Sequence, residues 1–333
     1  AVSIGEQGGA NNKLQETYAT TVHAQDAIKW KKFTLTPGVR FEYIAQSFDQ
    51  FEPKDVVNAQ MDYGVIVGGG SLKYDMYDVN GQDFDLFGGV HRGFSPPSPS
   101  SSSTNGLREE TSVGYELGAR YKDAPKAFAT EAVLFLTNFN NLIVNDSVGG
   151  TGSGNTVNAG KVRTMGVEFQ VNYDHGLAKN WAVQTPVYVA FTFTDATFRE
   201  DLSSTDQESI FAGAKKENDV PYIANEVLSF GWGLIYKKFS VNFDANYTSQ
   251  AFADGSNLGV QINPETNVAD ERFGNIDEQF VIDAALGYQI NKKVRLFSTF
   301  KNITDSKYIV SRQPHGPRPG LPFAMMAGLE FSL

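Results

Sequence analysis

The chain has 333 residues, no cysteine and a formal net charge of −10 at pH 7. The missing cysteines exclude disulfide frameworks, thiolate metal sites and cysteine nucleophiles, and the acidic balance argues against nucleic acid, which needs clustered Lys and Arg. Hydrophobic residues make up 41% without any run near the roughly 18 apolar residues of a transmembrane helix, whereas 25 Phe, 14 Tyr and 32 Gly suit strands and tight turns.

Apolar and polar residues alternate with period two along most of the chain. The clearest case is GVEFQVNY at 166–173, and the segments 113–122 and 239–248 repeat it. Such alternation is typical of strands with one apolar and one polar face. Thirteen strands are predicted, at 15–28, 32–47, 60–77, 83–94, 111–122, 126–142, 163–174, 181–198, 224–236, 239–250, 276–290, 293–309 and 322–333.

The connections between these strands alternate between short and long. The short ones are 29–31, 79–82, 123–125, 175–180, 237–238 and 291–292. The long ones are 48–59, 95–110, 143–162, 199–223, 251–275 and 310–321. All tight turns therefore lie at one end of an up-and-down meander, as in an antiparallel transmembrane β-barrel of the outer membrane. The alternative fold is a soluble all-β sandwich or propeller.

An odd number of strands does not close an antiparallel barrel. The first and last predicted strands both run toward the short turns, and the last ends on alternating Ala327, Leu329 and Phe331. Single-chain bacterial barrels normally have an even strand count. Residues 1–333 are therefore expected to form one domain, the carboxy-terminal part of a larger barrel that is incomplete at its amino terminus.

Several segments resemble the carboxy-terminal half of TonB-dependent outer-membrane receptors. They are LTPGVRFEY at 35–43, GGVHRGFSPPS at 88–98, REETSVGYELGARYK at 108–122, MGVEFQVNY at 165–173, FKNITDSKY at 300–308 and RPGLPFAMMAGLEFSL at 318–333. The pair VHRGFSPP and SRQPHGPRPGLP is most similar to the ferric dicitrate receptor branch. The chain departs from the family pattern at Leu333, where an aromatic residue is usual, and it contains neither the plug domain nor the TonB box.

This resemblance implies a barrel of about 22 strands around a plug, in contact with lipid in the bacterial outer membrane. It also implies capture of an iron chelate, such as ferric citrate or another siderophore. The TonB–ExbB–ExbD complex would energise transport through amino-terminal parts outside this chain. No covalent chemistry is involved, so the chain is not expected to be an enzyme, and iron is expected only within the bound chelate rather than as a cofactor.

Two groups of residues are predicted to contact the ligand, because the planar guanidinium of Arg pairs with carboxylates through two hydrogen bonds. They are His91 and Arg92 at the end of the fourth strand, and Arg312, Gln313, His315 and Arg318 in the last long loop. The alternative is that they are ordinary polar residues of the lumen and loops. Inward-facing polar residues are predicted to line the lumen, namely Arg40, Glu42, Glu116, Arg120, Glu168, Asp244 and Asp283. No catalytic or metal site is predicted, since the four His are scattered and no nucleophile accompanies Glu116 and Glu168.

Two other functions stay open at this point. A passive diffusion channel would lack a plug, and a surface barrel would bind a ligand or glycan without moving it across the membrane. Energy-dependent uptake separates both from a TonB-dependent transporter.

Overall fold

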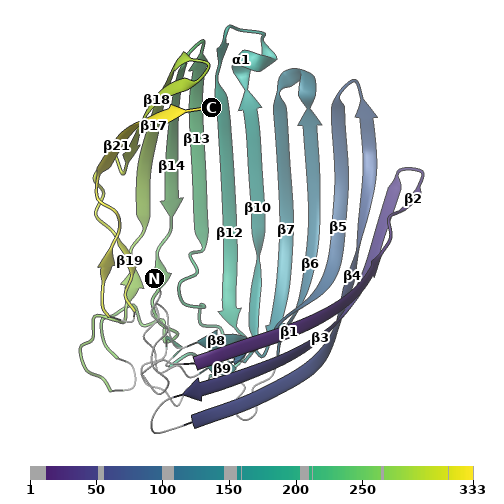
Figure 1. Cartoon of the computed structure of the whole chain (residues 1–333), viewed down its shortest axis with the longest axis vertical. Coiled ribbons are helices and arrows are strands. Elements are labelled where there is room, and N and C mark those ends of the chain that lie inside the picture. The colour runs from purple at the N-terminus through teal and green to yellow at the C-terminus, as the bar shows by residue number, and fades with distance from the viewer. Residues whose placement is uncertain are drawn as a thin grey trace.

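A single antiparallel sheet dominates the computed structural model (Figure 1), which describes residues 13–51, 56–99, 109–145, 156–158, 160–202, 210–211, 213–263, 266–313 and 315–332. Thirteen strands follow one another across the sheet in chain order, as the sequence predicts. They are β1 (Lys13–Gln25), β3 (Phe33–Phe51), β4 (Val56–Val79), β5 (Gln82–Ser95), β6 (Glu110–Asp123), β7 (Phe128–Asn140), β10 (Val162–Asp174), β12 (Pro186–Phe198), β13 (Glu226–Tyr236), β14 (Phe239–Thr248), β17 (Gln279–Asn291), β18 (Val294–Lys301) and β21 (Ala324–Phe331). The short strands β2 (Ile28–Trp30) and β11 (Val183–Gln184) pair with β3 and β13.

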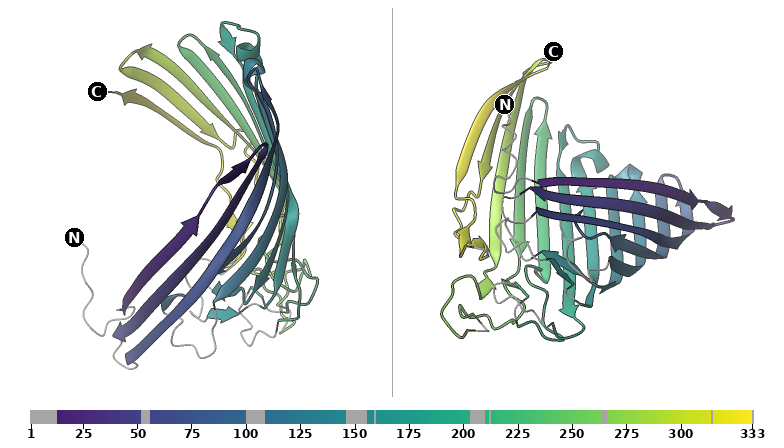
Figure 2. Two further views of the ribbon diagram at one scale, coloured as in Figure 1. Left: turned by 90° about the vertical axis from the view of Figure 1, so that its right-hand side faces the viewer. Right: turned by 60° about the horizontal axis from the view of Figure 1, so that its bottom comes forward.

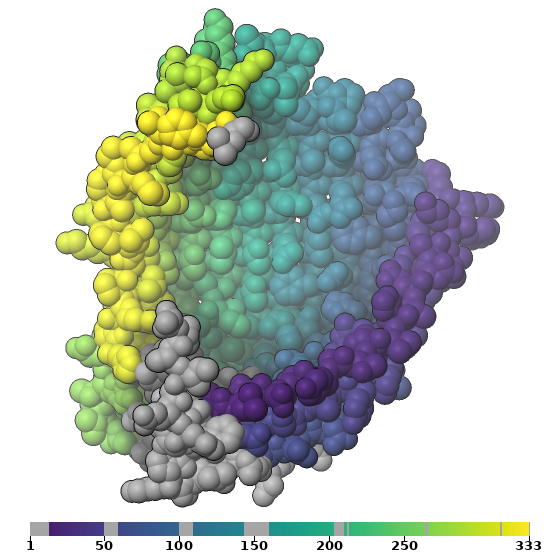
Figure 3. All heavy atoms as spheres, in the orientation of Figure 1, coloured from purple at the N-terminus to yellow at the C-terminus, as the bar shows by residue number. Residues whose placement is uncertain are grey.

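The sheet curves into a trough that is open along one side (Figures 2 and 3). Among the described strands, β1 pairs only with β3 and β21 only with β18, so the two outermost edges are unpaired. Both edge strands run toward the end that carries the short turns. Antiparallel closure between them therefore requires an odd number of additional strands.

Short turns gather at one end of the trough, the top of Figure 1. Asn80 and Gly81 form one of them with φ of 56° and 79°, the left-handed pair that suits a two-residue hairpin. Two others contain the one-turn helices η2 (Ala124–Lys126) and α1 (His175–Ala178). Among the described residues, no helix is long and apolar enough to cross a membrane.

The long connections lie at the opposite end and contain small sheets that the sequence pattern does not predict. These are the pairs β8 (Ile143–Asn145) with β9 (Thr156–Asn158), β15 (Ala251–Phe252) with β16 (Asn275–Ile276), and β19 (Ile309–Ser311) with β20 (Arg318–Pro319). The separation of short and long connections to opposite ends confirms the predicted up-and-down meander. The predicted long connection 48–59 is wrong, because β3 and β4 extend into it and pair from Phe48 with Ala59 to Phe51 with Val56.

Two predicted strands are interrupted because prolines lack the N–H that a ladder needs. The predicted strand 15–28 breaks after Gln25, where Asp26 donates its N–H to the Pro37 carbonyl (3.2 Å) but Pro37 cannot donate in return. The predicted strand 181–198 breaks at Thr185, just before Pro186, and the Thr185 N–H donates to Asp174 Oδ1 instead (3.0 Å).

The predicted strand 293–309 is wrong beyond Lys301. Asn302 takes a left-handed φ of 48° and is only 1% exposed. Its side chain donates to the carbonyls of Ser306 and Leu321, both at 2.9 Å, so the chain turns there rather than continuing the ladder. A buried asparagine in this role ends the strand early.

The two faces of the wall differ as the alternation predicts. Residues such as Leu117, Leu134 and Val167 lie opposite one another on β6, β7 and β10, and the first two are 62% and 56% exposed. Side chains on the outside of a curved wall spread apart, whereas those on the inside converge. On β3 the apolar outward residue Tyr43 is 42% exposed and the inward Ile44 is 3% exposed. The convex face is thus a broad apolar surface of the kind that lipid covers.

Candidate functional site: the lumen wall and the long-loop mouth

The concave face carries the polar residues that the alternation assigns to the lumen. Cross-strand pairs tie them to one side of the sheet: Glu116 lies opposite Phe135, and Asp244 opposite Asp283. The full set on this face is Arg40, Glu42, Glu116, Arg120, Glu168, Asp244 and Asp283. The hollow that they line faces the viewer in Figure 3. A wall of this composition suits a wet interior.

Most of these charges have a partner on the same face. The pairs are Arg40 with Glu42 (3.0 Å), Lys301 with Asp283 (2.6 Å), Arg120 with Glu131, and the Tyr188 hydroxyl donating to Asp244 (2.7 Å). Glu116 and Glu168 differ, since neither forms a hydrogen bond or ion pair with another described residue. Their carboxylates therefore face the hollow without a partner among the described residues.

Aromatic rings lie flat against the concave wall where the next strand has a glycine. A Cβ atom added to Gly118 or Gly231 would overlap with the ring of Phe87 or Tyr188, the residue directly opposite in each case. The same arrangement recurs in the pairs His91 with Gly114, Phe135 with Gly166, and Phe297 with Gly328. These glycines keep the rings on the wall and leave the hollow wide.

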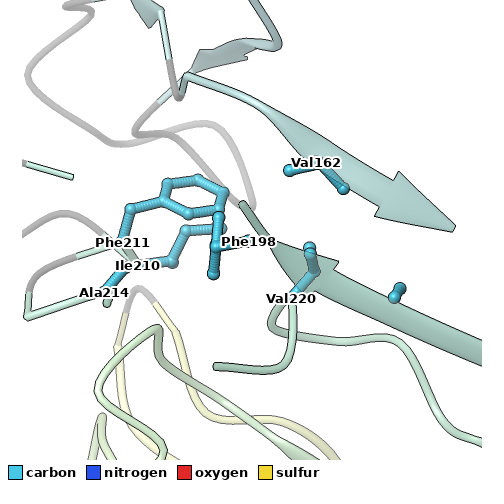
Figure 4. Close-up of a cluster of buried hydrophobic side chains, with 7 residues drawn as sticks. Val162, Phe198, Ile210, Phe211, Ala214 and Val220 are labelled. Atoms are coloured by element: carbon cyan, nitrogen blue, oxygen red, sulfur yellow. The ribbon is translucent and has the colours of Figure 1, made fainter. Parts of the chain in front are cut away.

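Residues of the loop between β12 and β13 pack against side chains of the inner wall near its end (Figure 4). Phe211 and Ile210 of this loop pack against Phe198, which is fully buried, with the two phenyl rings 5.8 Å apart and perpendicular. The cluster is Val162, Ala196, Phe198, Ile210, Phe211, Ala214 and Val220. Because Val162, Ala196 and Phe198 belong to the inner wall, the loop lines the mouth from inside.

A second loop, between β14 and β17, is fixed to the first by hydrogen bonds. Asp254 is 1% exposed and accepts from the backbone N–H groups of Ser256 (3.0 Å) and Gly274 (3.1 Å). Asn218 of the first loop donates to the Gly255 carbonyl (2.8 Å), and Asn257 Oδ1 accepts from the Asp219 N–H (2.5 Å). A buried carboxylate whose two oxygens both accept hydrogen bonds from backbone N–H groups stabilises the loop conformation rather than binding an ion.

Arg312 and Gln313, both predicted ligand contacts, are buried where the last long loop meets the other two. Arg312 is 5% exposed, and its guanidinium donates to the carbonyls of Asn275 (2.5 Å) and Glu271 (3.2 Å). The Tyr222 hydroxyl accepts from the Gln313 N–H (3.0 Å). The structure therefore gives Arg312 a clamping role between loops, and its contact with a ligand stays a prediction.

The other predicted ligand residues lie in two places. His315 and Arg318 are exposed on the last long loop, and Arg318 lies in β20. His91 lies on the concave face over Gly114. Arg92 alternates to the other face of β5, opposite Val113, and lines one side of a cavity of about 560 Å³ that also includes His23 and Arg40.

Sequence reasoning missed His23 as a neighbour of Arg40. The strand pairing in the structure makes them neighbours, because His23 of β1 lies directly opposite Arg40 of β3. Alternation alone puts each residue on a face but does not give the register between strands. The Arg40 guanidinium also lies 6.0 Å from the Phe94 ring centroid, which adds an aromatic side to this basic part of the wall.

The pKa values of two loop carboxylates are shifted in opposite directions. Hydrogen bonds from the Arg272 guanidinium, at 2.7 to 3.0 Å, lower the pKa of Asp270. Burial, with a smaller effect from the charge of Asp195, raises the pKa of Asp219. In the part of the chain that the structure describes, no group of three or more His, Cys, Asp or Glu side chains could hold a metal ion.

The family model described as TonB dependent receptor-like, beta-barrel matches residues 3–303. The chain belongs to this family. Its relatives are receptors and transporters, and barrels of this family are bacterial outer-membrane proteins. The plug domain of such receptors is not part of the structure.

Solved structures support the same fold. The ferric citrate transporter FecA in its unliganded form superposes with a TM-score of 0.72 at 23% identity, over 96% of this chain and 45% of that one. The siderophore receptor PiuA from Acinetobacter baumannii gives 0.73 at 16% identity, over 95% and 43%. The copper transporter OprC gives 0.67 at 13% identity, over 96% and 48%. The chain thus spans less than half the length of each of these three proteins.

Proposed function

We propose that this chain is the carboxy-terminal part of a bacterial outer-membrane barrel that takes up an iron chelate by TonB-coupled transport. The observation that carries the proposal is the match of the family model to residues 3–303. The geometry agrees with it: an apolar convex face, a polar hollow and a mouth built of long loops at one end only.

The rest of the transporter would complete the barrel and fill it. The two unpaired edges, β1 and β21, would join further strands of a barrel of about 22. A plug domain would occupy the hollow and contact the TonB–ExbB–ExbD complex. In this arrangement residues 1–333 form one structural domain together with the missing strands.

The substrate we propose is an anionic iron chelate, with ferric citrate as the first candidate. FecA, a ferric citrate transporter, and PiuA, a siderophore receptor, share the fold. Arg40 and Arg92 bring positive charge to a cavity that also includes His23, and Arg92 is exposed there. Guanidinium groups bind carboxylate-rich ligands through paired hydrogen bonds. His91, His315 and Arg318 are the further proposed contacts.

Ligand binding to the complete receptor tests the substrate. Ferric citrate should bind, and Arg92→Ala should weaken its binding about tenfold, a loss of about 1.4 kcal/mol. Arg163→Ala is the matched control, because Arg163 lies in the same cross-strand row and on the same face as Arg92 but outside the cavity, and its guanidinium donates to Asn138 (3.3 Å). Equal, weak responses to citrate, hydroxamate and catecholate iron complexes would contradict the iron assignment.

Uptake of radioactive iron separates the proposed transporter from its rivals. Uptake should require both the receptor and TonB. Uptake that continues in cells without TonB would indicate a passive channel instead. Chelate binding without any uptake would indicate a surface-binding barrel.

A further inference from the structure

Lysines occupy the short-turn end of the barrel at nearly every turn. The Asn80–Gly81 turn has no lysine, and the lysines at the other described short turns are all exposed. They are Lys31, Lys32, Lys126, Lys179, Lys237, Lys238, Lys292 and Lys293, called here the lysine rim. Since the whole chain carries a net charge of −10, a basic rim at one end is a marked separation of charge.

Most carboxylates at the same turns form hydrogen bonds or ion pairs within their own turn. Asp123 is 1% exposed, accepts from the Lys126 N–H (3.1 Å) and pairs with the Lys126 ammonium (3.0 Å). Asp174 is 8% exposed and accepts from the N–H groups of Leu177 and Thr185. Asp26 is the exposed carboxylate of the first turn, and Asp78 and Asp83 face each other toward the hollow. Asp123 offsets the charge of Lys126, and the other rim lysines leave the outer side of the rim basic.

A belt of aromatic rings runs around the convex face beside the lysine rim. Successive ring centroids lie 4.7 to 6.4 Å apart. The continuous series is Tyr77, Phe84, Tyr121, Phe128, Tyr173, His175 and Trp181. Trp30 with Phe33 and Phe239 with Tyr288 extend the belt on either side. Amphipathic rings in such a belt lie at the headgroup level of a membrane.

Two rim lysines are held against outward-facing rings, Trp30 of the belt and Tyr236, which lies directly opposite Phe239. The Lys31 ammonium lies 5.1 Å from the centre of Trp30, and the Lys237 ammonium lies 5.0 Å from the centre of Tyr236. Trp30 is 64% exposed and Tyr236 37% exposed. These ammonium groups therefore sit on the outer side of the wall at the headgroup boundary, rather than over the hollow.

We propose that the lysine rim binds the phosphate groups of anionic phospholipids in the leaflet at the short-turn end. The proposal rests on the membrane placement given above. A basic residue beside an anionic membrane surface strengthens binding by about fivefold. Lysine is suited to this role because its three donors and flexible stem reach phosphates at varied positions. The rings contribute the apolar contact with the acyl chains just below.

Tryptophan quenching in bilayers tests the proposal on the complete receptor. Brominated phosphatidylglycerol and brominated phosphatidylcholine are compared as quenchers, and a W30F/W181F variant identifies the rim's share of the signal. Phosphatidylglycerol should be favoured by about threefold or more at low salt, and less at high salt. The K31Q/K237Q variant should lose most of this preference. The K215Q/K216Q variant, with the same charge change on an exposed part of a long loop, should keep it.

Equal quenching by the two lipids in the wild-type receptor would overturn the proposal, as would an equal loss in both lysine variants. An unchanged lipid preference in K31Q/K237Q together with lost iron uptake would also overturn it and indicate a protein partner at the rim. The absence of quenching by either lipid is a different result, because it would contradict the membrane placement itself.

Discussion

Tyr188 reaches Asp244 across an intervening strand because Gly231 has no side chain. The three residues lie directly opposite one another on β12, β13 and β14, and the Tyr188 hydroxyl donates to Asp244 at 2.7 Å. The ring crosses the position that a Cβ of residue 231 would occupy. A single missing side chain thus fixes the rotamer of an aromatic residue and the hydrogen bond at its end.

Gly231→Ala should therefore destabilise the barrel by about 1–3 kcal/mol, because the Tyr188 ring must move away from the wall and lose Asp244. Urea unfolding of the complete receptor in micelles measures the change. Gly70→Ala is the matched control, since the nearest atoms to its added Cβ are 3.8 Å away. Equal stability of the two variants would show that the ring over Gly231 has no such role.

Arg312→Ala should loosen the long loops even without ligand. It removes donors from the carbonyls of Asn275 and Glu271, which costs about 1.5–3 kcal/mol for each bond to a charged group. Hydrogen exchange should become faster in residues 253–276 and 309–313. Arg318→Ala, at an exposed position, should leave exchange there unchanged. Unaltered exchange in Arg312→Ala would instead leave its side chain free to serve the ligand.

At the scale of elements, the strands of the wall were readable from sequence and the loop scaffold was not. The two faces of β10 and β14 contact different surroundings, so apolar and polar residues alternate with period two. This alternation can be seen in the sequence alone. Contacts such as Tyr222 with Gln313 join residues far apart in the chain and follow no period. For this reason His91 and Arg92 could be placed near a strand end, whereas the burial of Arg312 could not be foreseen.

The inward-folded loop between β12 and β13 depends on its aromatic contact with the wall. Phe211→Ala removes the ring that packs perpendicular to Phe198, and should lower the free energy of loop opening by roughly 3 kcal/mol. Limited proteolysis of the receptor should then cut this loop faster. Leu258→Ala is the control, because Leu258 is 56% exposed on the neighbouring loop. Similar cleavage rates in the two variants would contradict the packing role.

The loop between β14 and β17 should open in acid. Hydrogen bonds from Arg272 lower the pKa of Asp270 in the folded loop, so the charged carboxylate is the favoured form there. The stabilisation is complete above the ordinary Asp pKa of about 3.9 and is lost as the pH falls through the lowered value. Hydrogen exchange in residues 266–276 should rise over that range in the wild type. Asp270→Asn should remove this pH dependence, and a persistent one would assign it to another group.

For the whole molecule, the amphipathic wall follows from the sequence, but its closure does not. Alternation gives the faces, and the segregation of short and long connections gives the meander. Closure depends on what pairs with the outer edges of β1 and β21, and no pattern within these residues specifies it. Substrate choice is likewise undetermined by pattern, because it depends on which loop side chains the scaffold leaves exposed, such as Arg318, and which it buries, such as Gln313.

The central claim is that the convex face of the wall contacts lipid and the concave face contacts water. Single cysteines at 167 to 171 of β10, in a chain that has no cysteine of its own, allow spin labels to be scanned across both faces in the bilayer-embedded receptor. Labels at Val167, Phe169 and Val171 should be accessible to oxygen, and labels at Glu168 and Gln170 to a water-soluble nickel chelate. Accessibility without a two-residue period, or with the two faces exchanged, would contradict the account.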